Sequence, residues 1–178
     1  MIILIGGSSH VGKTYICQKL MQRLSIPYIS IDHLKMGFIR TGMTDITTEE
    51  DQEMMVFIWP YVAEIIKTAV ENNQNLIIEG CYIPEYWADS FTEEYLPSIH
   101  TFFITMSEKY IRSHMHEIAD YACIIENRID DDIDYERLIY CSKVKKEDAL
   151  SSGAHLIEIT DSYDIDAMTD EIISVVSK

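Results

Sequence analysis

The sequence has few positively charged residues for its length. Its 178 residues include 14 Lys plus Arg against 30 Asp plus Glu, which gives a formal net charge of −16. Nucleic-acid binders need a basic surface to neutralise phosphates, and anionic membranes attract basic segments. We therefore expect neither nucleic acid nor a membrane surface as a partner. The hydrophobic fraction of 47% is typical of a packed domain, so the charge does not indicate disorder.

Long apolar runs and targeting signals are also lacking. The opening apolar run, 2–5, has no basic residue before it and ends at two glycines, too early for a secretory signal. The longest apolar stretch, 54–70, is interrupted by a proline and two charged residues, so it does not predict a membrane span. We expect a chain with neither kind of segment.

Paired cysteines are missing as well. The four cysteines are widely spaced and form no CxxC motif, which indicates reduced, mostly buried thiols in a cytoplasmic protein. None stands in a recognisable activating motif, so a nucleophilic cysteine is not expected. The four are Cys17, Cys81, Cys123 and Cys141.

Short apolar runs alternate with helical patterns along the chain. The apolar runs predict strands at 2–5, 28–32, 76–78, 101–105 and 155–160. Apolar residues at helical spacing predict helices at 13–24, about 47–72, most of 108–150, and 165–176. We expect Thr47 and Glu50 to cap the second helix and Pro60 to kink or split it. Strands alternating with helices over one domain length predict a single α/β domain, 1–178, with a parallel sheet.

Residues 7–14 match the phosphate-binding pattern GxxxxGK[ST] at every specified position. Glycines let backbone N–H groups turn toward one phosphate, and the start of the next helix adds its positive dipole end. Lys13 supplies a mobile charge for the transferred phosphoryl group, and the Thr14 hydroxyl is a ligand for Mg²⁺. The NKxD motif of GTPases is absent. We expect ATP to bind at Gly7, Ser8, Ser9, His10, Val11, Gly12, Lys13 and Thr14.

Three segments give the chain a resemblance to the small-molecule kinases of the P-loop superfamily. They are 7–14, 30–36, and 77–80 followed by Pro84. Within the nucleoside monophosphate kinase-like superfamily, the chain is similar to 2-phosphoglycerate-kinase-like, zeta-toxin-like and chloramphenicol-phosphotransferase-like proteins. The resemblance implies a three-layer fold with a five-stranded parallel sheet in the order 2-3-1-4-5. It also implies an acceptor-binding insert at about 33–60 and a helical lid at about 108–135.

The function that the resemblance implies is an ATP- and Mg²⁺-dependent phosphotransferase acting on a hydroxyl of a small molecule. In such a kinase Asp32 would orient or deprotonate the acceptor hydroxyl, and Glu79 would hold the Mg²⁺ shell or touch the acceptor. Both carboxylates are expected at the carboxyl ends of strands, where ligands bind in open α/β sheets. The alternatives are that Asp32 caps the next helix and that Glu79 points into solvent.

Phosphoryl transfer needs further cations, and the sequence offers few. The resemblance makes Arg112 and Arg128 lid arginines, with surface salt bridges as the alternative. Along one straight helix these arginines would lie roughly 160° apart, so both reach one phosphate only if the helix breaks between them. Arg137 is expected to be structural. The acceptor-side candidates are Lys35, Arg40 and Tyr82, with a solvated cation or a core aromatic as the alternative roles.

Two other functions fit the same phosphate-binding motif. A nucleotide-binding switch or interaction protein would need the loop but no acceptor-side carboxylate. A nucleoside monophosphate kinase would also need it, but the Asp-Gly-Phe-Pro-Arg run of adenylate kinase is absent, and residues 79–84 contain no arginine. The net charge favours a neutral or singly charged acceptor over a heavily phosphorylated one. The acceptor's identity and the oligomeric state stay open.

Overall fold

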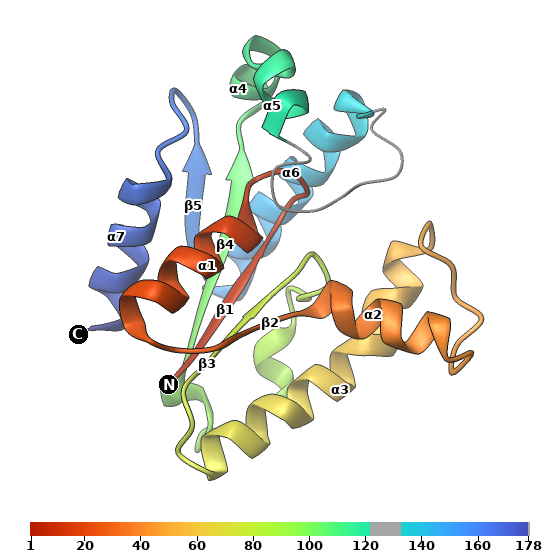
Figure 1. Cartoon of the computed structure of the whole chain (residues 1–178), viewed down its shortest axis with the longest axis vertical. Helices are drawn as coiled ribbons and strands as arrows, with labels where there is room; N and C mark the ends of the chain where they lie inside the picture. The colour runs from red at the N-terminus through yellow and green to blue at the C-terminus, as the bar shows by residue number, and fades with distance from the viewer. Residues whose placement is uncertain (122–132, 178) are drawn as a thin grey trace.

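One parallel sheet of five strands organises the protein. The computed structural model describes residues 1–121 and 133–177. The strands are β1 (Ile2–Gly7), β2 (Tyr28–Ser30), β3 (Leu76–Glu79), β4 (Ile99–Met106) and β5 (His155–Ile159). They lie in the order β2-β3-β1-β4-β5, and every neighbouring pair is parallel (Figure 1). The predicted sheet and its strand order are therefore confirmed.

Helices cover both faces of the sheet. In Figure 1, α1 (Lys13–Leu24) and α7 (Ile165–Val176) lie on one face, with the bounds that the sequence predicts. On the other face lie α3 (Asp51–Glu71) and α6 (Tyr135–Ser152). Shorter elements complete the described fold: α2 (Ile31–Arg40), α4 (Glu108–Ser113), α5 (Met115–Tyr121), and the 3-10 turns η1 (Trp87–Ser90) and η2 (Leu96–Ser98).

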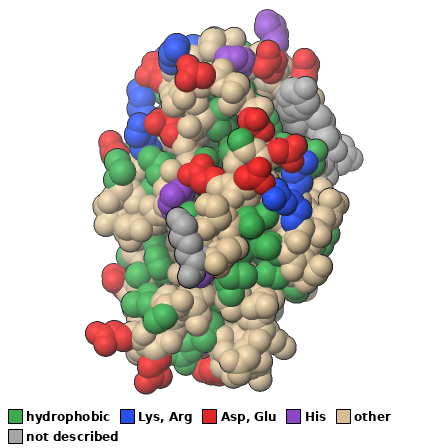
Figure 2. Space-filling model, turned by 90° about the vertical axis from the view of Figure 1, so that its left-hand side faces the viewer, with side chains coloured by type: hydrophobic (Ala, Val, Ile, Leu, Met, Phe, Trp, Pro, Cys, Tyr) green, Lys and Arg blue, Asp and Glu red, His purple; other side chains and the backbone are tan. Residues whose placement is uncertain are grey.

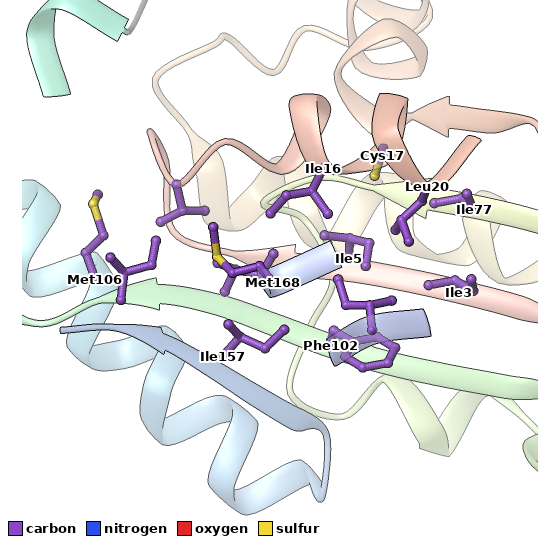
Figure 3. Packing of buried hydrophobic residues seen from close by; sticks show 14 of the residues in the cluster. Ile3, Ile5, Ile16, Cys17, Leu20, Ile77, Phe102, Met106, Ile157 and Met168 are labelled. Atoms are coloured by element: carbon purple, nitrogen blue, oxygen red, sulfur yellow. The ribbon is translucent and has the colours of Figure 1, made fainter. Parts of the chain in front are cut away.

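Strand β1 lies at the centre of the core. Ile3 and Ile5 pack with residues of α1 and α7, as Figure 3 shows, whereas Ile2 and Leu4 pack with residues of α3. All four side chains are fully buried. Burial on both faces explains the unbroken apolar run in the sequence, because each such side chain stabilises the fold by about 1.5–3 kcal/mol.

The predicted end of β2 is wrong by two residues. The strand ends at Ser30, because its partner β3 ends at Glu79, the residue that pairs with Ser30. Helix α2 then begins at Ile31, whose side chain is fully buried. Asp32 consequently lies in the first turn of α2 rather than on the strand.

The predicted start of the long helix is also wrong. The backbone N–H of Thr47 donates to the Glu50 carboxylate at 2.8 Å, which closes a turn in front of α3, and the helix starts at Asp51. The helix continues through Pro60 without splitting. Buried side chains on both sides of the proline, Trp59 and Val62 among them, hold it against the core and offset the missing hydrogen bond.

The described residues of the region 108–150 form three separate helices. Helix α4 ends at Ser113, α5 follows from Met115, and α6 starts at Tyr135. Asp134, part of the predicted acidic interruption, caps α6 by accepting from the backbone N–H of Arg137 at 2.9 Å. The acidic residues at 130–132 lie outside the described residues.

The surface and the cysteines agree with the composition. Figure 2 shows the face on the left of Figure 1, and the charged side chains visible at its lower end are acidic. No helix within the described residues is long and apolar enough to cross a membrane. Cys17, Cys81 and Cys141 are free thiols, of which Cys17 is buried and the other two half-buried. Cys123 lies outside the described residues.

Candidate active site

The phosphate-binding loop connects β1 to α1 and lies tightly against β4. Gly7 has a φ of +127°, and a Cβ on it would lie 2.0 Å from the carbonyl oxygen of Ile104. The same carbonyl accepts from the Ser8 N–H at 3.2 Å. Gly12, with a φ of +78°, stands at the N-cap of α1 and supplies no side chain to cap that helix. The first-turn N–H groups are thus suited to binding an anion.

The remaining loop residues are held by the fold. Ser8 is buried and its hydroxyl accepts from the Ser142 hydroxyl of α6 at 2.8 Å. Val11 is fully buried in the core, Ser9 is half-buried, and His10 has a φ of +62°. The loop conformation is therefore tied to β4 and α6.

Lys13 is the first residue of α1 and its side chain is buried. Its Nζ donates to the Ser8 carbonyl at 2.8 Å and to the Cys81 sulfur at 3.2 Å. Burial by itself lowers the pKa of Lys13, but attraction to Cys81, Glu79 and Asp32 outweighs it and leaves the pKa above its usual value. The side chain is therefore an ammonium ion near neutral pH.

Glu79 ends β3 and is only 1% exposed, so the alternative of a solvent-facing carboxylate is wrong. The Thr14 hydroxyl donates to its Oε1 at 3.3 Å. A hydroxyl and a carboxylate are hard oxygen donors of the kind that Mg²⁺ takes in nucleotide sites. These two residues, together with the nearby charge of Lys13, fit a site for Mg²⁺ bound to a nucleotide.

A chain of polar contacts runs from Asp32 to Arg137. Asp32, whose side chain is 39% exposed, accepts from Lys35 at 2.7 Å, and Lys35 also donates to the Tyr82 hydroxyl at 2.9 Å. Tyr82 donates to Oδ1 of Asp51 at 3.1 Å, and Arg137 donates to Oδ2 of Asp51 at 2.9 Å. The chain connects α2, the segment after β3, α3 and α6.

Burial and the contacts within this set of residues shift the pKa values of Lys35 and Tyr82. Burial lowers the pKa of Lys35, but its contacts with Asp32 and Tyr82 raise the pKa well above the usual value. Burial raises the pKa of Tyr82, so its hydroxyl stays protonated. The N-cap of α2 is Ser30, so Asp32 does not take the capping position of the alternative role.

The structure brings some predicted site residues together and leaves others apart. Lys35 and Tyr82 lie beside Asp32, whereas Arg40 is exposed at the last position of α2 and has no ion pair with a described residue. Arg137, expected to be structural, forms an exposed ion pair with Asp51 at 2.9 Å, which agrees with that expectation. The sequence reasoning missed Asp51 and Cys81, because their contacts with Arg137 and Lys13 join segments far apart in the chain.

Of the two predicted lid arginines, Arg112 belongs to the described residues and forms surface ion pairs. Arg112, on α4, forms ion pairs with Glu108 at 2.9 Å and with Glu136 at 2.8 Å, and its side chain is 45% exposed. Its surroundings in this conformation are those of the salt-bridge alternative. Both arginines could reach one phosphate only if the helix ends between them. Helix α4 does end between them, at Ser113. Arg128 lies outside the described residues.

Several solved structures have a similar fold over their whole length. A sugar kinase from Janibacter sp. HTCC2649 superposes with a TM-score of 0.61 at 13% identity, covering 99% of this chain and 94% of that chain. For a shikimate kinase from Bacteroides thetaiotaomicron the TM-score is 0.59 at 14% identity, with 100% and 99% covered. For a gluconokinase from Sinorhizobium meliloti 1021 it is 0.58 at 13% identity, with 98% and 90% covered.

Sequence comparison adds nothing to this structural likeness: no family model and no curated protein matches the chain. At these identities the likeness concerns the fold. The chain has the three-layer fold of P-loop small-molecule kinases, with the parallel sheet order 2-3-1-4-5.

Proposed function

We propose that the protein is an ATP- and Mg²⁺-dependent kinase that phosphorylates a hydroxyl group of a small molecule. The observation that carries the proposal is the convergence of three side chains, from the end of β3 and the start of α2, on the Lys13 ammonium. Cys81 and Glu79, at the end of β3, and Asp32, at the start of α2, all lie close enough to raise its pKa. A phosphate-binding lysine next to two carboxylates suits phosphoryl transfer better than it suits a nucleotide-binding switch, which needs no acceptor-side carboxylate.

The nucleotide side of the site follows from the loop. The N–H groups of the loop and of the first turn of α1 would bind the phosphates, and Lys13 would exchange its Ser8 and Cys81 contacts for a phosphate oxygen. Thr14 and Glu79 would hold Mg²⁺. Bound MgATP supplies the phosphoryl group and neutralises part of the charge that develops on it.

The acceptor side follows from the polar chain. Asp32 would accept a hydrogen bond from the acceptor hydroxyl and take its proton during the attack. Lys35 orients the Asp32 carboxylate through their ion pair, and Tyr82 in turn holds Lys35. Arg137 connects α6 to the start of α3 through its ion pair with Asp51.

A lid over the site would exclude water and suppress ATP hydrolysis. We assign this role to about 108–135, with Arg112 and Arg128 closing over the transferred group. The ion pairs of Arg112 are exposed, and such pairs contribute only about 0–1 kcal/mol, so the side chain can leave them at low cost.

For the acceptor, the proposal extends to its chemical class. The resemblance to 2-phosphoglycerate-kinase-like, zeta-toxin-like and chloramphenicol-phosphotransferase-like proteins, together with the solved kinases of similar fold, supports a polyhydroxy or hydroxy-acid acceptor. The net charge of −16 and the pairing of Lys35 with Asp32 favour a neutral or singly charged molecule.

The test is ADP release from MgATP with a panel of hydroxyl compounds, including gluconate, shikimate and neutral sugars, against a water-only baseline. Release above the baseline with an acceptor, lost in Lys13→Ala, supports the proposal. ATP binding with no acceptor-dependent release from the panel or from a small-molecule cell extract would favour the nucleotide-binding switch. Release only with nucleoside monophosphates would favour a monophosphate kinase.

A further inference from the structure

The connection between β5 and α7 brings a tyrosine against the phosphate-binding loop. Strand β5 ends at Ile159 and α7 begins at Ile165, and both β1 and β5 belong to one parallel sheet, so the connection 160–164 and the phosphate-binding loop lie at the same edge (Figure 1). A Cβ built on Gly12 would lie 2.0 Å from the hydroxyl oxygen of Tyr163 and 3.2 Å from the ring carbon that bears it. The hydroxyl therefore lies directly in front of the Gly12 backbone.

The space in front of Gly12 is space that a bound phosphate needs. Gly12 is the glycine that precedes Lys13 in the motif, and it stands at the N-cap of α1. Glycine at such a position lets the backbone N–H groups come close to the phosphates, because no side chain stands between them. The N–H groups of the first turn of α1 point into the same space. The Tyr163 hydroxyl thus stands where a phosphate has to approach the loop.

The hydroxyl of Tyr163 is enclosed by the protein but weakly held. The residue as a whole is 41% exposed, whereas burial raises the pKa of its hydroxyl to about 12. The hydroxyl end is therefore the enclosed part, and it is protonated near neutral pH. Within residues 1–121 and 133–177 the hydroxyl makes no hydrogen bond. Moving it out of the loop therefore breaks no hydrogen bond of the protein.

The segment around Tyr163 also leaves the side chain room to move. Asp161 pairs with Lys109 of α4 at 3.4 Å, with side chains 79% and 83% exposed, and such a pair contributes only about 0–1 kcal/mol. Asp164 caps α7 by accepting from the Ala167 N–H at 2.9 Å. The helix start is thus fixed by the residue after Tyr163, so the tyrosine can swing away without disturbing the cap.

We propose that Tyr163 is a displaceable cover on the phosphate-binding loop, and that its side chain gives way when the phosphates of a nucleotide bind. This role rests on the nucleotide binding of the proposed function and does not depend on phosphoryl transfer. A cover lowers the apparent affinity for the nucleotide by the fraction of molecules in which it is open. With an open fraction of about one in ten, its removal would tighten binding about tenfold.

Calorimetric titration with MgATP and with magnesium tripolyphosphate tests the cover. Tripolyphosphate has no base or ribose, so a contact between Tyr163 and the nucleoside does not affect its affinity. We expect Tyr163→Ala to bind each probe about tenfold more tightly than the wild type. Tyr140→Ala, at a position 68% exposed on α6, is the matched control and should keep the wild-type affinity. Equal or weaker binding by Tyr163→Ala would overturn the role of Tyr163, and so would a gain confined to MgATP.

A second variant and a spectroscopic signal complete the test. Tyr163→Phe removes only the hydroxyl, and it should tighten binding by a smaller factor even if Tyr163→Ala is unstable. In ¹⁹F NMR of protein that contains 3-fluorotyrosine, the Tyr163 resonance is the one missing from Tyr163→Phe. Tripolyphosphate should move this resonance, and an unmoved resonance with the probe bound would overturn the cover. Binding of MgATP by no variant would overturn the proposed function itself, whereas MgATP binding without a gain in either variant would overturn the cover alone.

Discussion

Replacing Gly7 by alanine should damage the phosphate-binding loop more than any other single methyl group. The new Cβ would lie 2.0 Å from the Ile104 carbonyl oxygen and 2.7 Å from the Ile104 nitrogen. Both are backbone atoms of a central strand, so neither can move aside cheaply. The φ of +127° is also a conformation that alanine rarely adopts.

The size of the effect follows from these contacts. A non-glycine residue at such a φ costs about 1–3 kcal/mol, and the Ser8 N–H to Ile104 hydrogen bond contributes about 0.5–1.5 kcal/mol. We expect Gly7→Ala to lower the free energy of unfolding by about 2–4 kcal/mol and the melting temperature by about 4–16 °C. ATP binding should weaken as well, because the loop N–H groups are displaced.

Gly37→Ala is the matched control. Gly37 lies within α2 and has no positive φ, and a methyl group added to it would meet no other atom within 4 Å. Alanine there should raise stability by about 0.5–1 kcal/mol through helix propensity. Thermal unfolding of both variants, followed by circular dichroism, measures the contrast. A melting temperature of Gly7→Ala equal to that of the wild type would refute the reasoning about the loop.

Three further predictions test individual side chains. Asp32→Asn should lower kcat about 10²–10⁴-fold and leave ATP affinity unchanged. Steady-state kinetics measures the effect, with Asp45→Asn, at an exposed position, as the control. A kcat equal to that of the wild type would show that Asp32 takes no part in the reaction. Glu79→Gln should reduce the Mg²⁺ dependence of ATP affinity, and an unchanged dependence in calorimetric titrations would exclude Glu79 from the ion's shell. Lys143 and Arg112 hold the pKa of Glu108 below its usual value of 4.5, so this carboxylate stabilises the fold above that pH and its contribution is lost as the pH falls. Glu108→Gln should therefore lose less stability than the wild type between about pH 6 and about pH 3 in denaturant unfolding, and equal losses would contradict the assignment.

Local patterns sufficed for the elements nearest the nucleotide loop. The start of β1, the phosphate-binding motif and both ends of α1 follow from consecutive residues, so they could be predicted. The end of β1 could not be predicted, because the strand continues two residues past 2–5, to Gly7, which pairs with Ile104 of β4. The end of β2 could not, because the length of its partner β3 sets it. The start of α3 depends on a turn in which Glu50, rather than Thr47, is the N-cap.

Contacts far apart in sequence account for what was missed at the site. Arg137 and Asp51 are 86 residues apart, and their ion pair depends on the start of α6 lying near the start of α3. The contact of Lys13 with Cys81 likewise depends on the pairing of β1 with β3. Asp32 and Glu79 were predictable because parallel strands end at a common edge, which places residues near the ends of β2 and β3 together whatever the loops contain.

The most direct test of kinase activity follows radiolabelled γ-phosphate from MgATP into the small-molecule fraction of a cell extract. The proposed function predicts a labelled small molecule with the wild-type protein, formed faster than inorganic phosphate. It predicts no labelled small molecule with Lys13→Ala, and labelling at least about a hundredfold slower with Asp32→Asn. ATP bound by the wild type, with label recovered only as ATP and inorganic phosphate, would contradict it.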